Sequence, residues 1–412
     1  EYLQVSMNEP DVTPQQTPSS PIVVDSTARR VWLVNPDNDS VAAVNADSLQ
    51  TEFEIGVGVH PMSVALDGFG QLWVTCQDDD SVWVLNAASG AVVEVLTLPW
   101  GSAPVAIVFS PDGVSGYIAT HGSGQVLRVD AATRSLAGTL AIGPTPRALA
   151  ITADGQRMLV TQFISTNGVG TVRSVDLAGF TASGALSLPL DTTSVDGSLA
   201  GRGLPNYLSG IAITPRDELA WVTAKKDNIL RGQFRDGLPL TFETTVRSQI
   251  SLLDLNLNEE QTGRRLDIDN HGQPSAVALS ESGERVFVTM QGNNRLIVLN
   301  QLGNEIVRVD TGLAPQGVAI DPVTNRVFTK DLMSRTVTVF DGAGLLSGGT
   351  ATLPQIARIA TVTSREGDTP FLSANDRSRW CTIAALVENG TYQIDPFLER
   401  RGIKQNRRPW ST

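Results

Sequence analysis

The chain has 412 residues, of which 18% are charged, and a formal net charge of −12. This excess of negative charge argues against a nucleic-acid partner, because binding to phosphates requires a basic surface. No apolar run reaches the roughly 18 residues that a membrane-crossing helix needs, so we expect no membrane span.

A repeat of about forty residues runs through most of the sequence. Six units open with a proline that precedes a short apolar strand and a polar turn: Pro21, Pro61, Pro104, Pro146, Pro274 and Pro315. A seventh copy, residues 211–214, follows Ser209-Gly210 instead of a proline. Because repeats of this length with four short strands are typical of β-propellers, the pattern predicts an all-β fold of seven four-stranded antiparallel blades.

The same four strands, a to d, are expected in each unit. Strand b alternates aromatic and β-branched residues, as in Leu72-Trp73-Val74-Thr75, and strand d is more polar, as suits an outer edge. Aspartates gather in the turns between strands b and c, at 37–39 and 78–80. Such turns are compatible with calcium, but their recurrence in several blades favours a turn-forming role.

Three segments are predicted: an extended lead-in over 1–20, the propeller over 21–363, and a tail over 364–412. In the lead-in, Leu3-Gln4-Val5 could add an edge strand that helps to close the ring. In the tail, the spacing of apolar residues between Ser373 and Gly390 predicts one amphipathic helix. This short helical tail could dock on the propeller or bind a partner.

Two excursions interrupt the repeat, at 189–208 between blades 4 and 5 and at 225–247 within blade 5. The first joins strand d to strand a and the second joins strand b to strand c, so both should emerge on the same rim. Long loops on a rigid scaffold often carry binding sites. The candidate binding residues are polar and basic side chains of these excursions: Arg202, Asn206, Tyr207, Lys225, Lys226, Asp227, Asn228, Arg231 and Arg235.

The basic members of this set have two interpretations. They could hold an anionic ligand, a haem propionate of a partner or an acidic protein surface. Alternatively, they pair within the excursions with Asp227, Asp236 and Glu243.

Few residues suggest catalysis or metal binding. His60, His121 and His271 are weak metal candidates, because His271 is expected across the ring from the other two, and we expect no metal. Cys76 lies in an apolar strand and is expected to be an inert core thiol, while a pairing with Cys381 stays open. The sequence has no nucleophile elbow and no phosphate-binding glycine motif.

The repeats resemble the YVTN-type propeller repeats of bacteria, which are related to WD40 repeats. Residues 201–209, 225–232, 235–237 and 245–248 are also similar to the propeller half of exported bacterial proteins that continue into a di-haem cytochrome c peroxidase-like domain. This resemblance implies a periplasmic or cell-surface location and a partner such as a c-type cytochrome or a peroxidase-like protein. The haem domain would require CxxCH motifs, which are absent, so no cofactor is expected.

These observations favour a non-catalytic binding or assembly module that docks a protein partner through the loop rim of blades 4 and 5. One alternative is a propeller enzyme, a lactonase or quinoprotein-like dehydrogenase, with its site at the channel mouth. Another is a structural subunit of a larger assembly.

Overall fold

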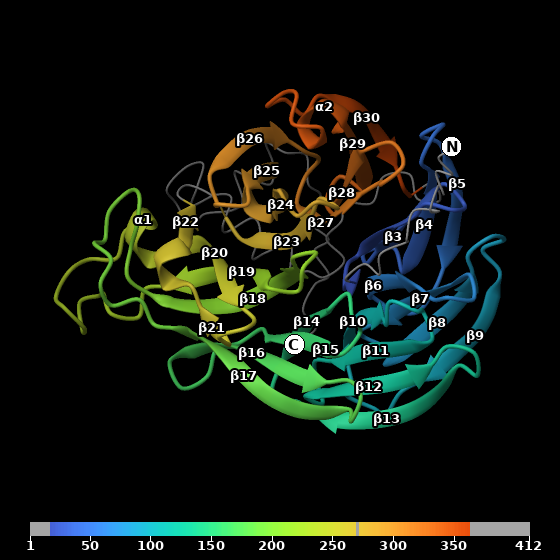
Figure 1. The fold of residues 1–412 in the computed structure, drawn as a ribbon, viewed down its shortest axis with the longest axis horizontal. Coiled ribbons are helices and arrows are strands. Elements are labelled where there is room, and N and C mark those ends of the chain that lie inside the picture. Colours follow the sequence, from blue (N-terminus) through green and yellow to red (C-terminus); the bar gives the residue numbers. More distant parts are fainter. Residues whose placement is uncertain (1–16, 269–271, 363–412) are drawn as a thin grey trace, which may run out of the picture. The chain divides into compact units, whose positions relative to one another are not determined.

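Seven antiparallel sheets of four main strands surround a central channel (Figure 1). The computed structural model describes residues 17–268 and 272–362, apart from the side chains of Thr17, Phe242 and Glu243. The predicted all-β, seven-bladed propeller is confirmed. The predicted strand at 3–5 and the tail at 364–412 lie outside the described residues. No helix in the described ranges is long and apolar enough to cross a membrane.

Each blade is built from consecutive strands. Blade 1 consists of β2 (Ile22–Asp25), β3 (Arg30–Asn35), β4 (Ser40–Asn45) and β5 (Thr51–Gly56), and blade 2 of β6 (Pro61–Leu66), β7 (Gln71–Cys76), β8 (Ser81–Asn86) and β9 (Val92–Thr97). Blade 3 consists of β10 (Pro104–Phe109), β11 (Ser115–Thr120), β12 (Gln125–Asp130) and β13 (Ser135–Ala141). Blade 4 consists of β14 (Pro146–Ile151), β15 (Arg157–Gln162), β16 (Val169–Asp176) and β17 (Thr181–Pro189). Blade 5 consists of β18 (Leu204–Ile213), β19 (Leu219–Asp227), β20 (Val246–Asp254) and an outer strand divided into β21 (Glu259–Glu260) and β22 (Leu266–Ile268). Blade 6 consists of β23 (Pro274–Leu279), β24 (Arg285–Met290), β25 (Arg295–Asn300) and β26 (Glu305–Asp310). Blade 7 consists of β27 (Pro315–Ile320), β28 (Arg326–Asp331), β29 (Thr336–Asp341) and β30 (Gln355–Ala360). The helices are single turns: α1 (Phe242–Thr245), α2 (Ala343–Leu346) and the 3₁₀ turns η1 (Thr262–Arg264) and η2 (Gln291–Asn293).

Large apolar side chains fill the interfaces between neighbouring blades. The third residue of each strand b is buried, and each packs in a cluster with residues of the following blade: Trp32, Trp73, Tyr117, Leu159, Trp221, Phe287 and Phe328. Phe328 of blade 7 packs with Ile22 and Val31 of blade 1, so the same apolar packing closes the ring. A single blade could not bury these side chains, which is why the repeats stabilise one another.

Polar side chains reinforce the junction between blades 7 and 1. Arg29 donates to both carboxylate oxygens of Asp321, at 2.9 and 2.8 Å. Thr361 donates its hydroxyl to the Asn35 side chain at 2.9 Å. Within the described ranges, blades 7 and 1 share no strand, so this junction is held by side chains.

The segment before blade 1 crosses the channel. β1 (Thr17–Pro18) pairs with the inner strand β14 of blade 4, and the Ser19 amide donates to the Leu149 carbonyl at 2.8 Å. The Val64 amide of blade 2 donates to the Ser20 carbonyl at 2.9 Å. Residues 17–21 therefore run inside the ring, and Pro18 and Ser20 line cavities on both sides of the segment.

The polar turns between strands b and c bind the backbone of the next blade. Asp80 accepts from the amides of Gly101 and Ala103, each at 2.7 Å. Asp39 and Asn294 accept in the same way from the amides of His60 and Ala314. These acceptors fix the chain just before the next strand a, which explains why the acidic turns recur.

Asp80→Ala should therefore destabilise the propeller by about 2 kcal/mol, because it removes two charge-assisted hydrogen bonds. Urea unfolding followed by circular dichroism would measure this as a lower midpoint with an unchanged slope. Asp80→Asn keeps one acceptor oxygen and should lose less than half as much. If Asp80→Ala and Asp80→Asn are both as stable as wild type, the hydrogen bonds that Asp80 accepts do not couple the blades.

Candidate functional site

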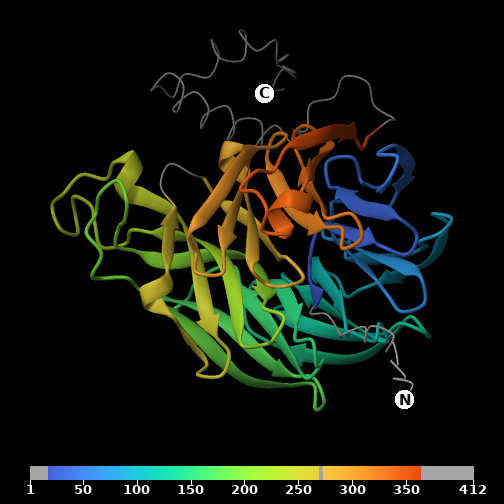
Figure 2. The same cartoon turned by 45° about the horizontal axis from the view of Figure 1, so that its top comes forward.

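The two excursions lie side by side on one rim. The first covers residues 190–203 between β17 and β18, and the second covers 228–245 between β19 and β20. Figures 1 and 2 both show these loops projecting together beyond blade 5. Arg202 of the first donates to Asp236 of the second at 2.8 Å, so the two loops support each other.

Asp196 is the centre of this support. It is nearly buried and accepts from the Arg202 guanidinium at 2.8 Å and from Arg231 at 3.2 Å. Burial opposes ionisation of Asp196, but the hydrogen bonds from Arg202 hold its pKa well below the usual range. Arg202 and Arg231 therefore contact a carboxylate of the excursion itself.

Lys226 lies beneath the excursions with 1% of its side chain exposed. Its ammonium contacts Asp191 at 2.9 Å and Asp267 at 2.7 Å, and it donates to the Gly201 carbonyl at 2.9 Å. It thus ties β19 to the first excursion and to the outer strand β22. The Lys226 charge stabilises the excursions from beneath and is not accessible to a partner.

The remaining candidates lie where the excursions leave the sheet. Asn206 donates to Asp227 at 2.8 Å, and Lys225 lies over the Tyr207 ring at 5.3 Å from its centroid. Burial lowers the pKa of Lys225 and the nearby Asp227 opposes this shift. Two further candidates belong to the second excursion: Asn228, whose side chain accepts from the Leu230 amide, and Arg235, which is exposed.

An aromatic chain leads from this cluster to the channel. Tyr207 packs edge-on against Phe163 at 5.3 Å, and Phe163 packs against His121 at 6.0 Å. The Arg147 guanidinium lies over the Phe163 ring, 5.5 Å from the ring centroid. The rim and the channel mouth are therefore connected by packed side chains.

His60 and His121 contact different partners. His60 pairs with Asp78 at 3.0 Å, whereas burial lowers the pKa of His121, whose Nδ1 lies 3.2 Å from the Pro146 carbonyl. His271 lies outside the described residues. In the part of the chain that the structure describes, no three His, Cys, Asp or Glu side chains are grouped to hold a metal ion.

Cys76 is a free, buried thiol whose pKa is raised to about 12 by burial. A thiol of this kind remains protonated at neutral pH, so it is a poor nucleophile. Cys381 lies outside the described residues, and the question of a pairing therefore stays a prediction.

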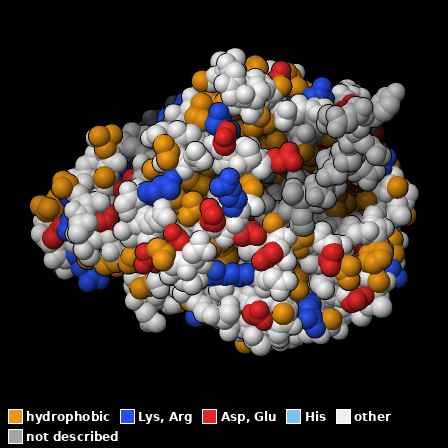
Figure 3. Space-filling model, in the orientation of Figure 1, with side chains coloured by type: hydrophobic (Ala, Val, Ile, Leu, Met, Phe, Trp, Pro, Cys, Tyr) orange, Lys and Arg blue, Asp and Glu red, His pale blue; other side chains and the backbone are white. Residues whose placement is uncertain are grey.

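The excursions also expose an apolar surface that the sequence analysis did not identify. Twenty-one large hydrophobic side chains are exposed among the described residues, and seven of them belong to this region: Val195, Leu199, Ile229, Phe234, Leu238, Leu240 and Val246. We call these seven residues the apolar rim. Phe234 is fully exposed, and Figure 3 shows hydrophobic side chains at the end of the molecule where the loops project. The sequence contained a signal for this surface, because the two excursions carry apolar residues although they match no strand of the repeat.

Comparisons with known proteins support the fold. No family model matches the sequence. The YncE protein of Salmonella typhimurium is 25% identical over 147 residues, and that of Salmonella typhi is 24% identical over the same length. Each match covers 34% of this chain and 41% of the relative, so the chain spans about two fifths of the curated relatives it matches.

A solved structure gives wider coverage. A chain of hydrazine synthase from Kuenenia stuttgartiensis matches with a TM-score of 0.66 and 17% sequence identity, over 83% of this chain and 99% of that chain. At this level of identity the similarity concerns the fold alone. The comparisons therefore agree with the sheet topology that this chain is a seven-bladed β-propeller.

Proposed function

We propose that this chain is a non-catalytic binding or assembly module that docks a protein partner through the apolar rim. The observation that carries the proposal is the exposure of six large apolar side chains on two excursions of an otherwise regular propeller, together with Val246 at the start of β20. Exposed apolar side chains that gather in one region are typical of protein interaction sites, whereas single exposed apolar residues are common on any protein surface.

The loops that carry the apolar rim are held in place by contacts beneath them, which favours binding. The Asp196 network joins the excursions, and the buried Lys226 fixes them to the sheet. Side chains held in place before binding lose little conformational entropy when a partner docks. Within the apolar rim, we expect Phe234 to be the strongest anchor, because it is fully exposed and aromatic residues contribute most to the energy of protein interfaces.

The partner we propose is a redox protein, such as a c-type cytochrome or a peroxidase-like protein, with an apolar docking face and a basic surround. The redox class comes from the resemblance to exported propellers that precede haem domains. Hydrazine synthase, an enzyme, contains a propeller chain of similar fold, which supports a role in an enzyme assembly. The basic surround is expected because the full chain carries a formal net charge of −12, and a negative charge attracts positively charged partners.

The same resemblance leads us to propose a periplasmic or cell-surface location for the protein. Fractionation of the source cells would test this separately from docking. Recovery of the protein in the cytoplasmic fraction would contradict the location and leave the binding surface unaffected.

The docking proposal predicts that Val195→Ser combined with Phe234→Ser weakens partner binding at least about tenfold, because two exposed anchors are removed. The immobilised full chain would be used to capture proteins from the source organism. The captured protein would then be purified and titrated against wild type and variant. Both substituted side chains are more than 80% exposed, so folding should be unaffected.

A matched control replaces exposed leucines elsewhere on the ring, Leu136→Ser combined with Leu302→Ser on blades 3 and 6. This variant should bind the purified partner as wild type does. Equal weakening in both variants, or in neither, would refute the apolar rim. A partner that binds through the rim but lacks a redox cofactor would refute only the redox class.

A further inference from the structure

The inner strands of six of the seven blades each bring one equivalent residue to the channel. In blades 2 to 7 this is the residue after the unit's proline, or Ser209 in blade 5, and together they form a ring: Met62, Val105, Arg147, Ser209, Ser275 and Gln316. Alignment of the sequence on its prolines would have identified these positions. They line a cavity of about 170 Å³ next to the segment 18–21. Phe163 and Leu332, which follow strands b, also line it, so the cavity faces the rim that carries the excursions.

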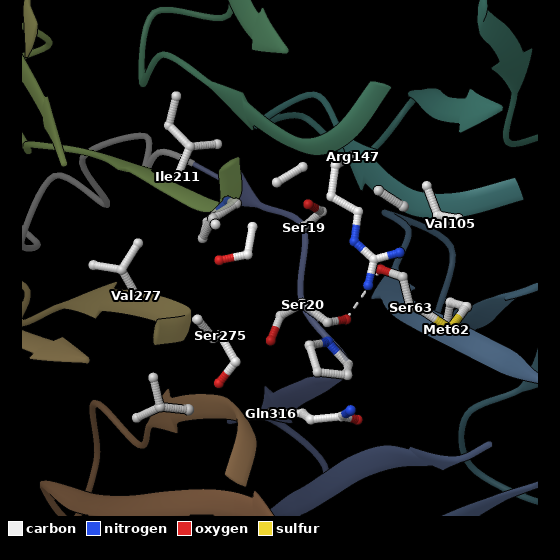
Figure 4. A pocket seen from close by; sticks show the side chains of 18 of the residues that line it. Ser19, Ser20, Met62, Ser63, Val105, Arg147, Ile211, Ser275, Val277 and Gln316 are labelled. Carbon is white, nitrogen blue, oxygen red and sulfur yellow. Dashed lines mark hydrogen bonds between the residues drawn. The ribbon is translucent and has the colours of Figure 1, made fainter. Parts of the chain in front are cut away.

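The polarity of this cavity is unusual for such an acidic protein. Among its described lining residues, Arg147 is the one Arg or Lys, and there is no Asp or Glu. Figure 4 shows Arg147 projecting toward Ser20 and Ser63. Within the described ranges, the Arg147 guanidinium has no ion pair and no hydrogen-bond acceptor, and it lies over the Phe163 ring. Burial lowers the pKa of Arg147, and no neighbouring acid compensates for the cost of the charge.

A second donor faces the same space. The Lys330 ammonium donates to the Gln316 amide oxygen at 2.7 Å, which leaves the amide nitrogen of Gln316 to donate elsewhere. The serines of the ring have a different role. Ser209 and Ser275 donate their hydroxyls to the carbonyls of Pro274 and Pro315, at 2.6 and 2.7 Å. The free donors of the ring are therefore on Arg147 and Gln316.

We propose that this cavity binds a small organic carboxylate, whose anionic end pairs with Arg147 and whose apolar body lies against the apolar walls. A fork of N–H donors on a guanidinium matches a carboxylate. Val105, Ile211 and Val277 supply apolar surface that a bare inorganic anion would leave uncovered. The volume is similar to that of protein cavities of about 150 Å³ that take up benzene, so a ligand of about six non-hydrogen atoms fits. This site is independent of partner docking at the apolar rim.

Butyrate is a suitable probe, and its neutral isostere butyramide tests the charge. We expect calorimetric titration of the full chain to show saturable butyrate binding, with butyramide at least about tenfold weaker. Arg147→Met should weaken butyrate binding by a similar factor, whereas Arg147→Lys should retain part of it. The exposed pair of Arg134 with Glu94 lies outside the channel, so Arg134→Met should bind butyrate as wild type does.

A second measurement guards against misfolding. Because Arg147→Met removes a charge that has no acidic partner, its melting temperature without ligand should equal or exceed that of wild type, while butyrate should raise the melting temperature of wild type alone. Equal butyrate affinity in wild type and Arg147→Met would overturn the site. Saturable binding of inorganic phosphate without binding of butyrate would overturn the carboxylate class.

Discussion

Arg29→Met should destabilise the folded ring by about 3 kcal/mol, because it leaves Asp321 buried without its cationic partner. The Asp321 side chain is fully buried and receives two hydrogen bonds from Arg29, while its remaining donors, Thr324 and the Val323 amide, are neutral. The pair joins blade 1 to blade 7, so its loss weakens the junction that closes the ring. Guanidinium or urea unfolding would measure the change.

This pair also predicts how stability depends on pH. Burial opposes ionisation of Asp321, but the hydrogen bonds from Arg29 lower its pKa to about 2. A carboxylate with a lowered pKa stabilises the fold above its unfolded value near 4, and this contribution disappears as the pH falls toward 2. The corresponding loss is about 2 kcal/mol. In Arg29→Met, the difference between stability at pH 6 and at pH 3 should be smaller than in wild type.

The control for both measurements is Arg134→Met, which removes an exposed pair with Glu94. Exposed pairs contribute little, so its stability should stay within about 0.5 kcal/mol of wild type. If Arg29→Met matches this control, the apolar cluster around Phe328 is sufficient to close the ring and the polar junction is dispensable.

Lys226→Met should cost about 3–5 kcal/mol locally, because it leaves the carboxylates of Asp191 and Asp267 without the ammonium between them. Both carboxylates belong to segments that lie against β19, so we expect the excursions to open before the blades do. Hydrogen exchange should show faster exchange at 190–203 and 228–245 and unchanged exchange in β10 to β13. Limited proteolysis should cut the variant in these loops.

Lys225→Met provides the matched control for this second prediction. Lys225 is the neighbouring residue on β19, and it lies over the Tyr207 ring without an ion pair to a described residue. Its replacement should leave the excursions closed. Should Lys226→Met also leave exchange in the two loops unchanged, the excursions are held by the Asp196 network alone.

The link between these two predictions is the requirement for a rigid platform. A closed ring fixes blades 4 and 5 relative to each other, and Lys226 fixes the excursions to blade 5. If the apolar rim binds a partner, Lys226→Met should weaken that binding although Lys226 itself is buried and cannot contact the partner. The same platform positions Phe163 between Tyr207 and Arg147, so the rim and the channel mouth share one support.

The sequence determined the number of blades, the order of strands and the buried aromatic positions. Proline, strand and turn recur in register, so the period of the repeat is unmistakable even where one copy deviates. The aromatic and β-branched residues of strand b predicted a packed strand, and Trp73 and its equivalents are buried because neighbouring blades cover both faces of these strands. It also located both excursions, since they are the two places where the unit is too long.

The sequence could not decide what the basic residues of the excursions do. Lys226 pairs with residues 35 and 41 positions away, and Arg29 pairs with Asp321 across 292 positions. Such contacts depend on how the ring closes and on how irregular loops fold back, and no period in the sequence encodes either. Only the tertiary structure showed that Arg202, Lys226 and Arg231 form an internal support. It also exposed Phe234 and left Arg147 without an acidic partner among the described residues of the channel.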